Sequence, residues 1–158
     1  MRVYHSSTCE VSRPDTHHSR DYLDFGRGFY VTTLKDQATS YAKRFTRRGR
    51  KAFLNTYLLD ELLLANFRVR RFDAYDEEWL DFVMTCRKGE DTSDWDVVVG
   101  GIANDRVFTT VDLYFSGEMS KRDALGRLAY EKPNDQLCIR TQEALDALLA
   151  FEGAEEVI

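Results

Sequence analysis

Two short segments near the start of the chain contain residue types that can hold a small polar ligand. The first contains His5 and Ser6, and the second runs from Asp24 to Tyr30 with the order Asp-Phe-Gly-Arg-Gly-Phe-Tyr. Imidazole both donates and accepts hydrogen bonds, so it suits a sugar diol. A phenol ring offers a flat π face to a cation, and glycine lets the backbone approach closely. These groups suit a ligand that has a flat charged ring and a sugar.

The order of these segments resembles a known class of enzyme. A strand with His, then Gly-x-Gly-aromatic-Tyr, then a helix is similar to the front half of the ADP-ribosyltransferases of the His-Tyr-Glu, diphtheria-toxin-like class. Later segments resemble an uncharacterised bacterial domain family of that superfamily: Glu77–Phe82, Val99–Asp105 and Asn134–Leu137. The resemblance covers nearly the whole chain. It implies an ADP-ribosyltransferase-like split β-sheet core with flanking helices.

The resemblance also implies that the chain binds NAD as a co-substrate. His5 is then expected to contact the adenosine ribose. Backbone groups at Ser6, where the family usually has Gly, are expected to clamp the nicotinamide carboxamide. Tyr30 is expected to stack on the nicotinamide ring, and Tyr41 on the following helix to complete the sandwich. For Tyr41 the alternative is a place in the core, because it falls on the apolar face of that helix.

Two further residues of the second segment are expected at the cofactor. Gly28 allows close approach of the backbone to the dinucleotide, and Arg27, like Arg20, is a candidate for the pyrophosphate. A solvated surface role is the alternative for each arginine. The neighbouring His17 and His18 do not indicate a metal site, because adjacent histidines face apart and no Cys or carboxylate cluster accompanies them at ligand spacing. We expect NAD and no metal.

The third catalytic position departs from the family pattern. The family has a Glu at the start of a late strand, and the matching position here is Gln136. A carboxylate there would stabilise an oxocarbenium-like transition state, as carboxylates do in glycosidases. A neutral amide can hold a ribose hydroxyl but supplies no charge. Glu131 and Asp135 are the alternatives that could provide the missing carboxylate.

These residues lead to three hypotheses on function. The first is a mono-ADP-ribosyltransferase that breaks the nicotinamide–ribose bond and transfers ADP-ribose to a macromolecule, either a protein or a nucleic acid. In it His5, Tyr30 and Gln136 form the catalytic set. The second is an NAD glycohydrolase, and the third a non-catalytic module that binds NAD or a partner. Some relatives look like toxins encoded beside a small antitoxin, so an antitoxin protein is a candidate partner.

Composition limits the classes further. The chain has 158 residues, a net charge of −5 and 43% hydrophobic residues, which fits one folded domain over residues 1–158. The acidic balance gives no support to general binding of duplex DNA. Three separated cysteines predict reduced thiols. No apolar run is long enough for a membrane span and no export signal is visible, so we expect a cytoplasmic protein that does not enter a membrane.

The pattern of elements is mixed, because strands do not alternate regularly with helices, and this predicts an α+β fold. Helices are expected from about 33, 76, 120 and 141, and strands at 2–5, 29–32, 53–59, 67–72, 95–99, 136–140 and near 157. The segment 106–115 is ambiguous: its β-branched run favours a strand, while its apolar spacing favours a helix, which is the expectation here. Thr33 is expected to cap the first helix, and Ser120 a later one.

A run of cations follows the first predicted helix. It contains Arg44, Arg47, Arg48, Arg50 and Lys51. Cations near a helix C-terminus complement the helix dipole. The alternative for this run is contact with an anionic substrate or partner.

Polar residues also follow the buried strand that ends at Gly100-Gly101. Asn104 and Asp105 either face a substrate or cap the next helix. Arg106 is a candidate for binding a phosphate in a bidentate way.

Overall fold

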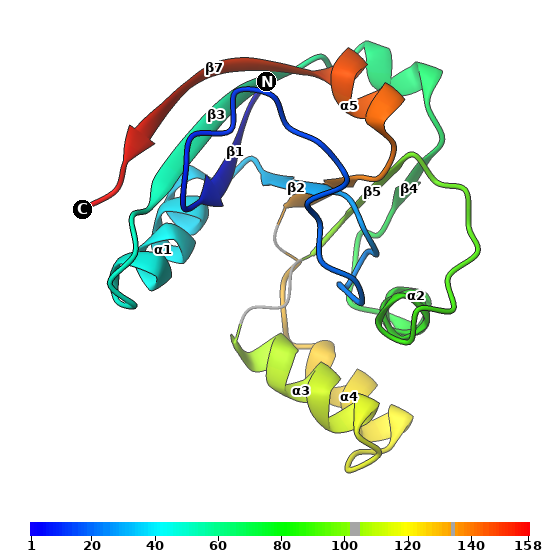
Figure 1. Ribbon diagram of the computed structural model, residues 1–158. Helices are drawn as coiled ribbons and strands as arrows, with labels where there is room; N and C mark the ends of the chain where they lie inside the picture. The colour runs from blue at the N-terminus through cyan, green and yellow to red at the C-terminus, as the bar shows by residue number, and fades with distance from the viewer. Residues whose placement is uncertain (102–104, 134) are drawn as a thin grey trace.

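The computed structural model describes residues 1–101, 105–133 and 135–158. Its strands are β1 (Arg2–Ser7), β2 (Phe29–Thr32), β3 (Phe53–Leu59), β4 (Val69–Arg71), β5 (Val97–Gly100), β6 (Gln136–Ile139) and β7 (Leu149–Glu156). Its helices are α1 (Lys35–Thr46), a 3-10 turn (Leu63–Asn66), α2 (Glu77–Arg87), α3 (Asp105–Phe115), α4 (Lys121–Leu128) and α5 (Gln142–Leu148). The predicted α+β class is confirmed (Figure 1).

The strands form one mixed sheet in the order β4-β5-β6-β2-β1-β3-β7. Among the strand pairs of the described residues, β4–β5 alone is parallel. Strand β1 pairs with β3 along its whole length, but with β2 it shares a single register pair, Tyr4 with Thr32. The sheet therefore divides between β1 and β2 into a half with β3 and β7 and a half with β6, β5 and β4 (Figure 1).

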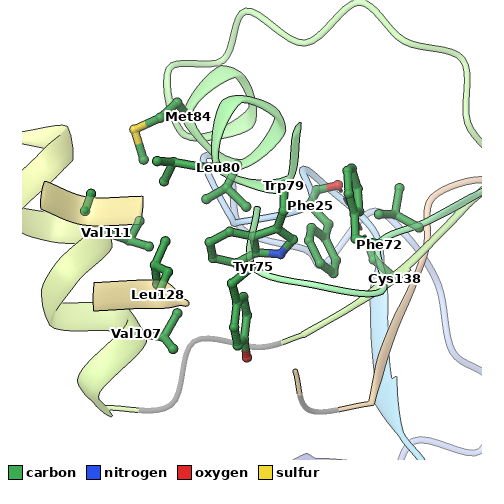
Figure 2. Packing of buried hydrophobic residues seen from close by; sticks show 13 residues of the cluster. Phe25, Phe72, Tyr75, Trp79, Leu80, Met84, Val107, Val111, Leu128 and Cys138 are labelled. Atoms are coloured by element: carbon green, nitrogen blue, oxygen red, sulfur yellow. Dashed lines mark hydrogen bonds between the residues drawn. The ribbon is translucent and has the colours of Figure 1, made fainter. Parts of the chain in front are cut away.

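Each face of the sheet packs on its own hydrophobic cluster, as period-two alternation requires. One cluster combines Phe29 and Val31 of β2 with α5 and the 3-10 turn. The other lies on the opposite face and includes Val98 and Cys138. Figure 2 shows that helix α2 supplies Trp79, Leu80 and Met84 to this second cluster, while α3 supplies Val107 and Val111 and α4 supplies Leu128.

Side-chain caps explain where several helices begin. Asp76 Oδ1 accepts a hydrogen bond from the Trp79 amide at 2.9 Å, and Ser120 Oγ accepts one from the Asp123 amide at 3.1 Å. The predicted Ser120 cap is thus confirmed. The predicted Thr33 cap is wrong, because α1 begins after Leu34, which has no side-chain cap.

The segment 106–115, ambiguous between strand and helix by composition, lies within α3. None of the helices in the described part of the chain has the length and apolar character needed to cross a bilayer.

Candidate functional site

His5 lies where β1 and β2 part. Its Nδ1 is 2.7 Å from the carbonyl oxygen of Tyr30, and its ring stacks on Phe29 with a centroid distance of 4.3 Å. A carbonyl oxygen only accepts, so Nδ1 carries the proton and a neutral ring keeps Nε2 as an acceptor. Burial lowers the pKa of His5, partly offset by the bond to Tyr30. The imidazole is therefore held neutral, in one tautomer.

Tyr30 is the neighbour of His5 across this split, and its side chain is firmly tied. Its hydroxyl donates to the Gly26 carbonyl at 2.5 Å and accepts from the Phe25 amide at 3.1 Å. The ring packs against the cluster that contains Phe25, on the opposite face of the sheet from Phe29. His5 and Tyr30 thus leave the sheet on opposite faces, and a ligand that touches both must lie along the split.

Gln136 begins β6, beside β2. Its register partners are Thr32 on β2 and Gly100 on β5. Directly opposed residues share a face, so Gln136 lies in one row with Gly100, Thr32 and Tyr4. Gln136 is half-buried, and its side-chain amide makes no hydrogen bond within the described part of the chain. The structure thus places His5, Tyr30 and Gln136 on three neighbouring strands, with Tyr30 and Gln136 on one face of the sheet and His5 on the other.

The two alternative carboxylates lie just before Gln136. The Asp135 carboxylate accepts a hydrogen bond from the Thr33 hydroxyl at 2.5 Å, and its carbonyl accepts one from the Thr32 hydroxyl at 2.7 Å. These bonds attach the start of β6 to the end of β2. Glu131 is half-buried. Asn134, between them, lies outside the described residues.

Nearly every residue of the segment Asp24–Tyr30 makes a contact inside the protein that accounts for its residue type. The Asp24 carboxylate pairs with the Arg87 guanidinium at 2.7 Å, and Phe25 is fully buried. At Gly28, a Cβ would lie 2.6 Å from both Cys138 Sγ and the Ile139 carbonyl oxygen. The close approach predicted for this glycine is therefore an approach to β6. Its approach to a dinucleotide stays a prediction.

Arg27 is the exposed member of the segment. Its guanidinium donates to the His17 carbonyl at 3.1 Å and lies 3.4 Å from the Asp21 carboxylate. Ser19 Oγ accepts a hydrogen bond from the Gly28 amide at 3.0 Å. These contacts tie the long polar loop at 10–24 to the Gly-Arg-Gly turn. Arg20 is exposed as well, and a pyrophosphate contact stays a prediction for both arginines.

The remaining predicted residues are Ser6 on β1 and Tyr41 on α1. The Ser6 hydroxyl donates to the Ala38 carbonyl at 2.5 Å, which attaches β1 to α1. Tyr41 has 42% of its surface exposed, with the Arg44 guanidinium 5.2 Å from its ring centroid. The core alternative for Tyr41 is therefore wrong, because Ala38 and Ala42 form the buried face of the helix. Its role at nicotinamide stays a prediction.

Some predicted polar residues fall outside what the structure describes. Asn104 is one of them, and the side chain of Asp105 is another, so their capping or substrate-facing role stays a prediction. In the loop at 10–24, His18 Nδ1 lies 2.7 Å from the Asp15 carboxylate. Over the described residues, no three His, Cys, Asp or Glu side chains gather in a way that could hold a metal ion.

A family model described as "Protein of unknown function (DUF3990)" matches residues 1–151. The chain belongs to the DUF3990 family. The match includes every residue assigned above to the site. Searches of the curated proteins and of the solved structures found no match to this DUF3990 chain.

The fold also adds residues that sequence reasoning did not assign to the site. Tyr4 and Thr32 join the row that contains Gln136, and Tyr4 also lines a shallow polar hollow of about 440 Å³ beside β1. Lys35 and Thr56 line the same hollow. The alternation along β1 is a signal for Tyr4. Thr32 and Thr56 could not be identified in this way, because their positions depend on the order of the strands, which only the structure gives.

Proposed function

We propose that this DUF3990 chain is an NAD-dependent mono-ADP-ribosyltransferase. In this proposal it cleaves the nicotinamide–ribose bond and transfers ADP-ribose to a macromolecule. The observation that supports the proposal is the position of His5, Tyr30 and Gln136 on the three adjacent strands β1, β2 and β6, beside the split in the sheet. These residues come from separate segments of the sequence and occupy the three positions that correspond to His, Tyr and Glu of the transferase class, with Gln136 in place of the Glu.

In the proposed site, the two ends of NAD meet different groups. The free Nε2 of the neutral His5 ring would accept a hydrogen bond from a ribose hydroxyl. The fixed Tyr30 ring would offer its π face to the nicotinamide pyridinium. Because the Tyr30 hydroxyl is already bonded to Gly26 and Phe25, the ring is positioned before the ligand arrives. Preorganisation of this kind lowers the entropic cost of binding.

Gln136 would act at the reacting carbon. Its amide has no hydrogen-bond partner among the described residues, so it is available for the hydroxyl of the nicotinamide-side ribose. As the C–N bond breaks, nicotinamide leaves with the bonding electron pair, and the positive charge moves to the ribose carbon. A lone pair of the acceptor then forms the new bond, and the proton of the acceptor passes to solvent. Asp135 or Glu131 would supply the negative charge that Gln136 lacks.

The test is the fate of NAD with the purified full chain. The protein is incubated with NAD labelled in the adenylate part, with and without cell extract, and free nicotinamide is measured by chromatography. Nicotinamide together with a labelled macromolecule supports the transferase. Nicotinamide with free ADP-ribose instead supports the glycohydrolase, and NAD binding without nicotinamide supports the non-catalytic module.

The proposal extends to the biological setting. A transferase of this kind would act as the toxin of a toxin–antitoxin pair in the cytoplasm, with a small antitoxin protein as its partner. Expression of the chain alone would then arrest growth, and a Gln136→Ala variant would not. Unimpaired growth at matched expression of the active protein would contradict this part of the proposal.

A further inference from the structure

One segment, residues 37–59, has a charge opposite to that of the whole chain. Although the chain has 27 acidic residues and a net charge of −5, no Asp or Glu occurs from Gln37 to Leu59. Within that stretch lies a dense group of cations, all exposed. We call them the cationic surface: Lys43, Arg44, Arg47, Arg48, Arg50 and Lys51.

The end of α1 brings these side chains together. The buried face of the helix is formed by Ala38 and Ala42, so Lys43 and Arg47 project from the outer side. The helix ends at Thr46, and Gly49 then turns the chain with a φ of +71°. That turn keeps the remaining cations at the same end of the helix, at the periphery of the molecule (Figure 1).

Neutralisation within the chain does not explain this surface. Of its members, Lys43, Arg47, Arg48, Arg50 and Lys51 form no ion pair with the described residues. Some cations elsewhere are paired: Lys121, for example, lies 2.8 Å from both Glu77 and Asp81. The helix dipole favours cations only within the last turn, and the last two members lie beyond it. Like charges this close repel one another, and an anionic partner would offset that cost.

We propose that the cationic surface binds single-stranded nucleic acid. Four of its six members are arginines, whose planar guanidinium groups bind phosphate in a bidentate way. Beside them the exposed Tyr41 ring lies near the Arg44 guanidinium, at 5.2 Å from ring centroid to Cζ. An aromatic ring next to arginine is the arrangement on which unpaired bases stack. In a duplex the bases stack on one another, so their faces are not open to Tyr41. An acidic protein carries no nucleobase that could stack on the ring.

The position of the surface relates it to the proposed catalytic site without depending on it. Ala38 of α1, which accepts the hydrogen bond from Ser6, is nine residues before Arg47, the C-cap residue of that helix. At about 1.5 Å per residue the separation is about 14 Å along the axis. A strand held at the cationic surface would therefore lie near the split between β1 and β2. The binding itself requires neither NAD nor turnover.

The experiment measures binding of the full chain, without NAD, to fluorescein-labelled 20-nucleotide single strands by fluorescence anisotropy. We expect binding at 50 mM salt that weakens steeply with added salt. The triple variant Arg47→Gln, Arg48→Gln, Arg50→Gln should bind at least tenfold more weakly. Its salt slope should fall by about two, since each phosphate contact on a single strand contributes about 0.7.

A matched triple variant controls for net charge. Lys88→Gln, Arg122→Gln and Arg127→Gln remove the same charge from exposed positions on other elements, and their affinity should stay within twofold of the parent. Tyr41→Ala should weaken binding about tenfold through lost stacking. Circular dichroism confirms that each variant is folded.

Several results would overturn the proposal: no binding at 50 mM salt, equal losses in the two triples, or equal competition by polyglutamate or phosphatidylserine vesicles. None of these bears on nicotinamide release, which tests the proposed function separately.

Discussion

Two parts of the proposed site differ in how the fold uses them. In the segment Asp24–Tyr30 nearly every side chain has a partner inside the protein, from the Arg87 ion pair to the bonds of the Tyr30 hydroxyl. At the start of β6, the side-chain amide of Gln136 has no hydrogen-bond partner among the described residues. The segment that stands out most in the sequence is thus chiefly a structural anchor. The residue that departs from the transferase pattern, Gln136, is the one whose side chain we propose for the chemistry.

The largest effect of this contrast on stability is expected at Gly28. Gly28→Ala puts a Cβ 2.6 Å from the Ile139 carbonyl oxygen, and backbone cannot give way as a flexible side chain can. We expect a loss of about 3 kcal/mol in the free energy of unfolding, measured with urea. Gly126→Ala is the control, since that helical position has open space and should gain up to about 1 kcal/mol. Equal changes in the free energy of unfolding of the two variants would contradict an anchoring role for this segment.

The ion pair that holds the segment comes next. Asp24→Asn removes one of the two carboxylates that pair with the Arg87 guanidinium, which is 10% exposed; among the described residues Asp112 at 3.0 Å is the one that remains. Removing one member of a partly buried pair should lower the free energy of unfolding by about 2 kcal/mol. The exposed pair Arg70–Glu78 provides the comparison, where Glu78→Gln should cost less than about 1 kcal/mol. If both variants unfold at the same urea concentration, Asp24 is no anchor.

A smaller effect is expected when Tyr30 loses only its hydroxyl. Tyr30→Phe leaves the Gly26 carbonyl and the Phe25 amide without their partner. The expected loss of unfolding free energy is about 1–2 kcal/mol. The ring face stays, so NAD affinity measured by calorimetry should change little. A large loss of affinity with unchanged stability would reverse the roles that we assign to ring and hydroxyl.

The smallest effect concerns pH. Burial holds the pKa of His5 below its ordinary value of 6.5, so the unfolded chain takes up a proton that the folded chain resists. Stability from this group is therefore present above about pH 6.5 and declines as the pH falls below it. Between pH 7.5 and 5.5 the unfolding free energy should fall more in the parent than in His5→Gln. Parallel pH profiles would show that the imidazole is not held neutral.

Much of the fold follows from the sequence, because strong local signals determine it. The apolar spacing on α2 and α3 and the cap at Ser120 mark helices by periodicity and hydrogen-bonding chemistry alone. The cap of α1 does not follow, since the Thr33 hydroxyl bonds instead to Asp135, about a hundred residues away. A local pattern cannot reveal a competitor so distant in sequence.

For the candidate site, the sequence likewise predicts the residues but not how they are arranged in space. The resemblance identifies His5, Tyr30 and Gln136, yet it does not reveal that the first two side chains leave the sheet on opposite faces. The faces of these side chains depend on the pairing of β1 with β2 at Tyr4 and Thr32, and local sequence does not specify which strands become neighbours. The exposure of Tyr41 was hidden for a related reason, because small alanines rather than aromatic rings fill the space under α1.

The most direct test of the central claim compares nicotinamide release from NAD by the parent protein and by Gln136→Ala, with urea unfolding of both. The account predicts release by the parent, its loss in the variant, and unfolding free energies within about 0.5 kcal/mol of each other, because the amide contacts no described partner. Equal release by the two proteins, or no release by the parent with any acceptor extract, would contradict it.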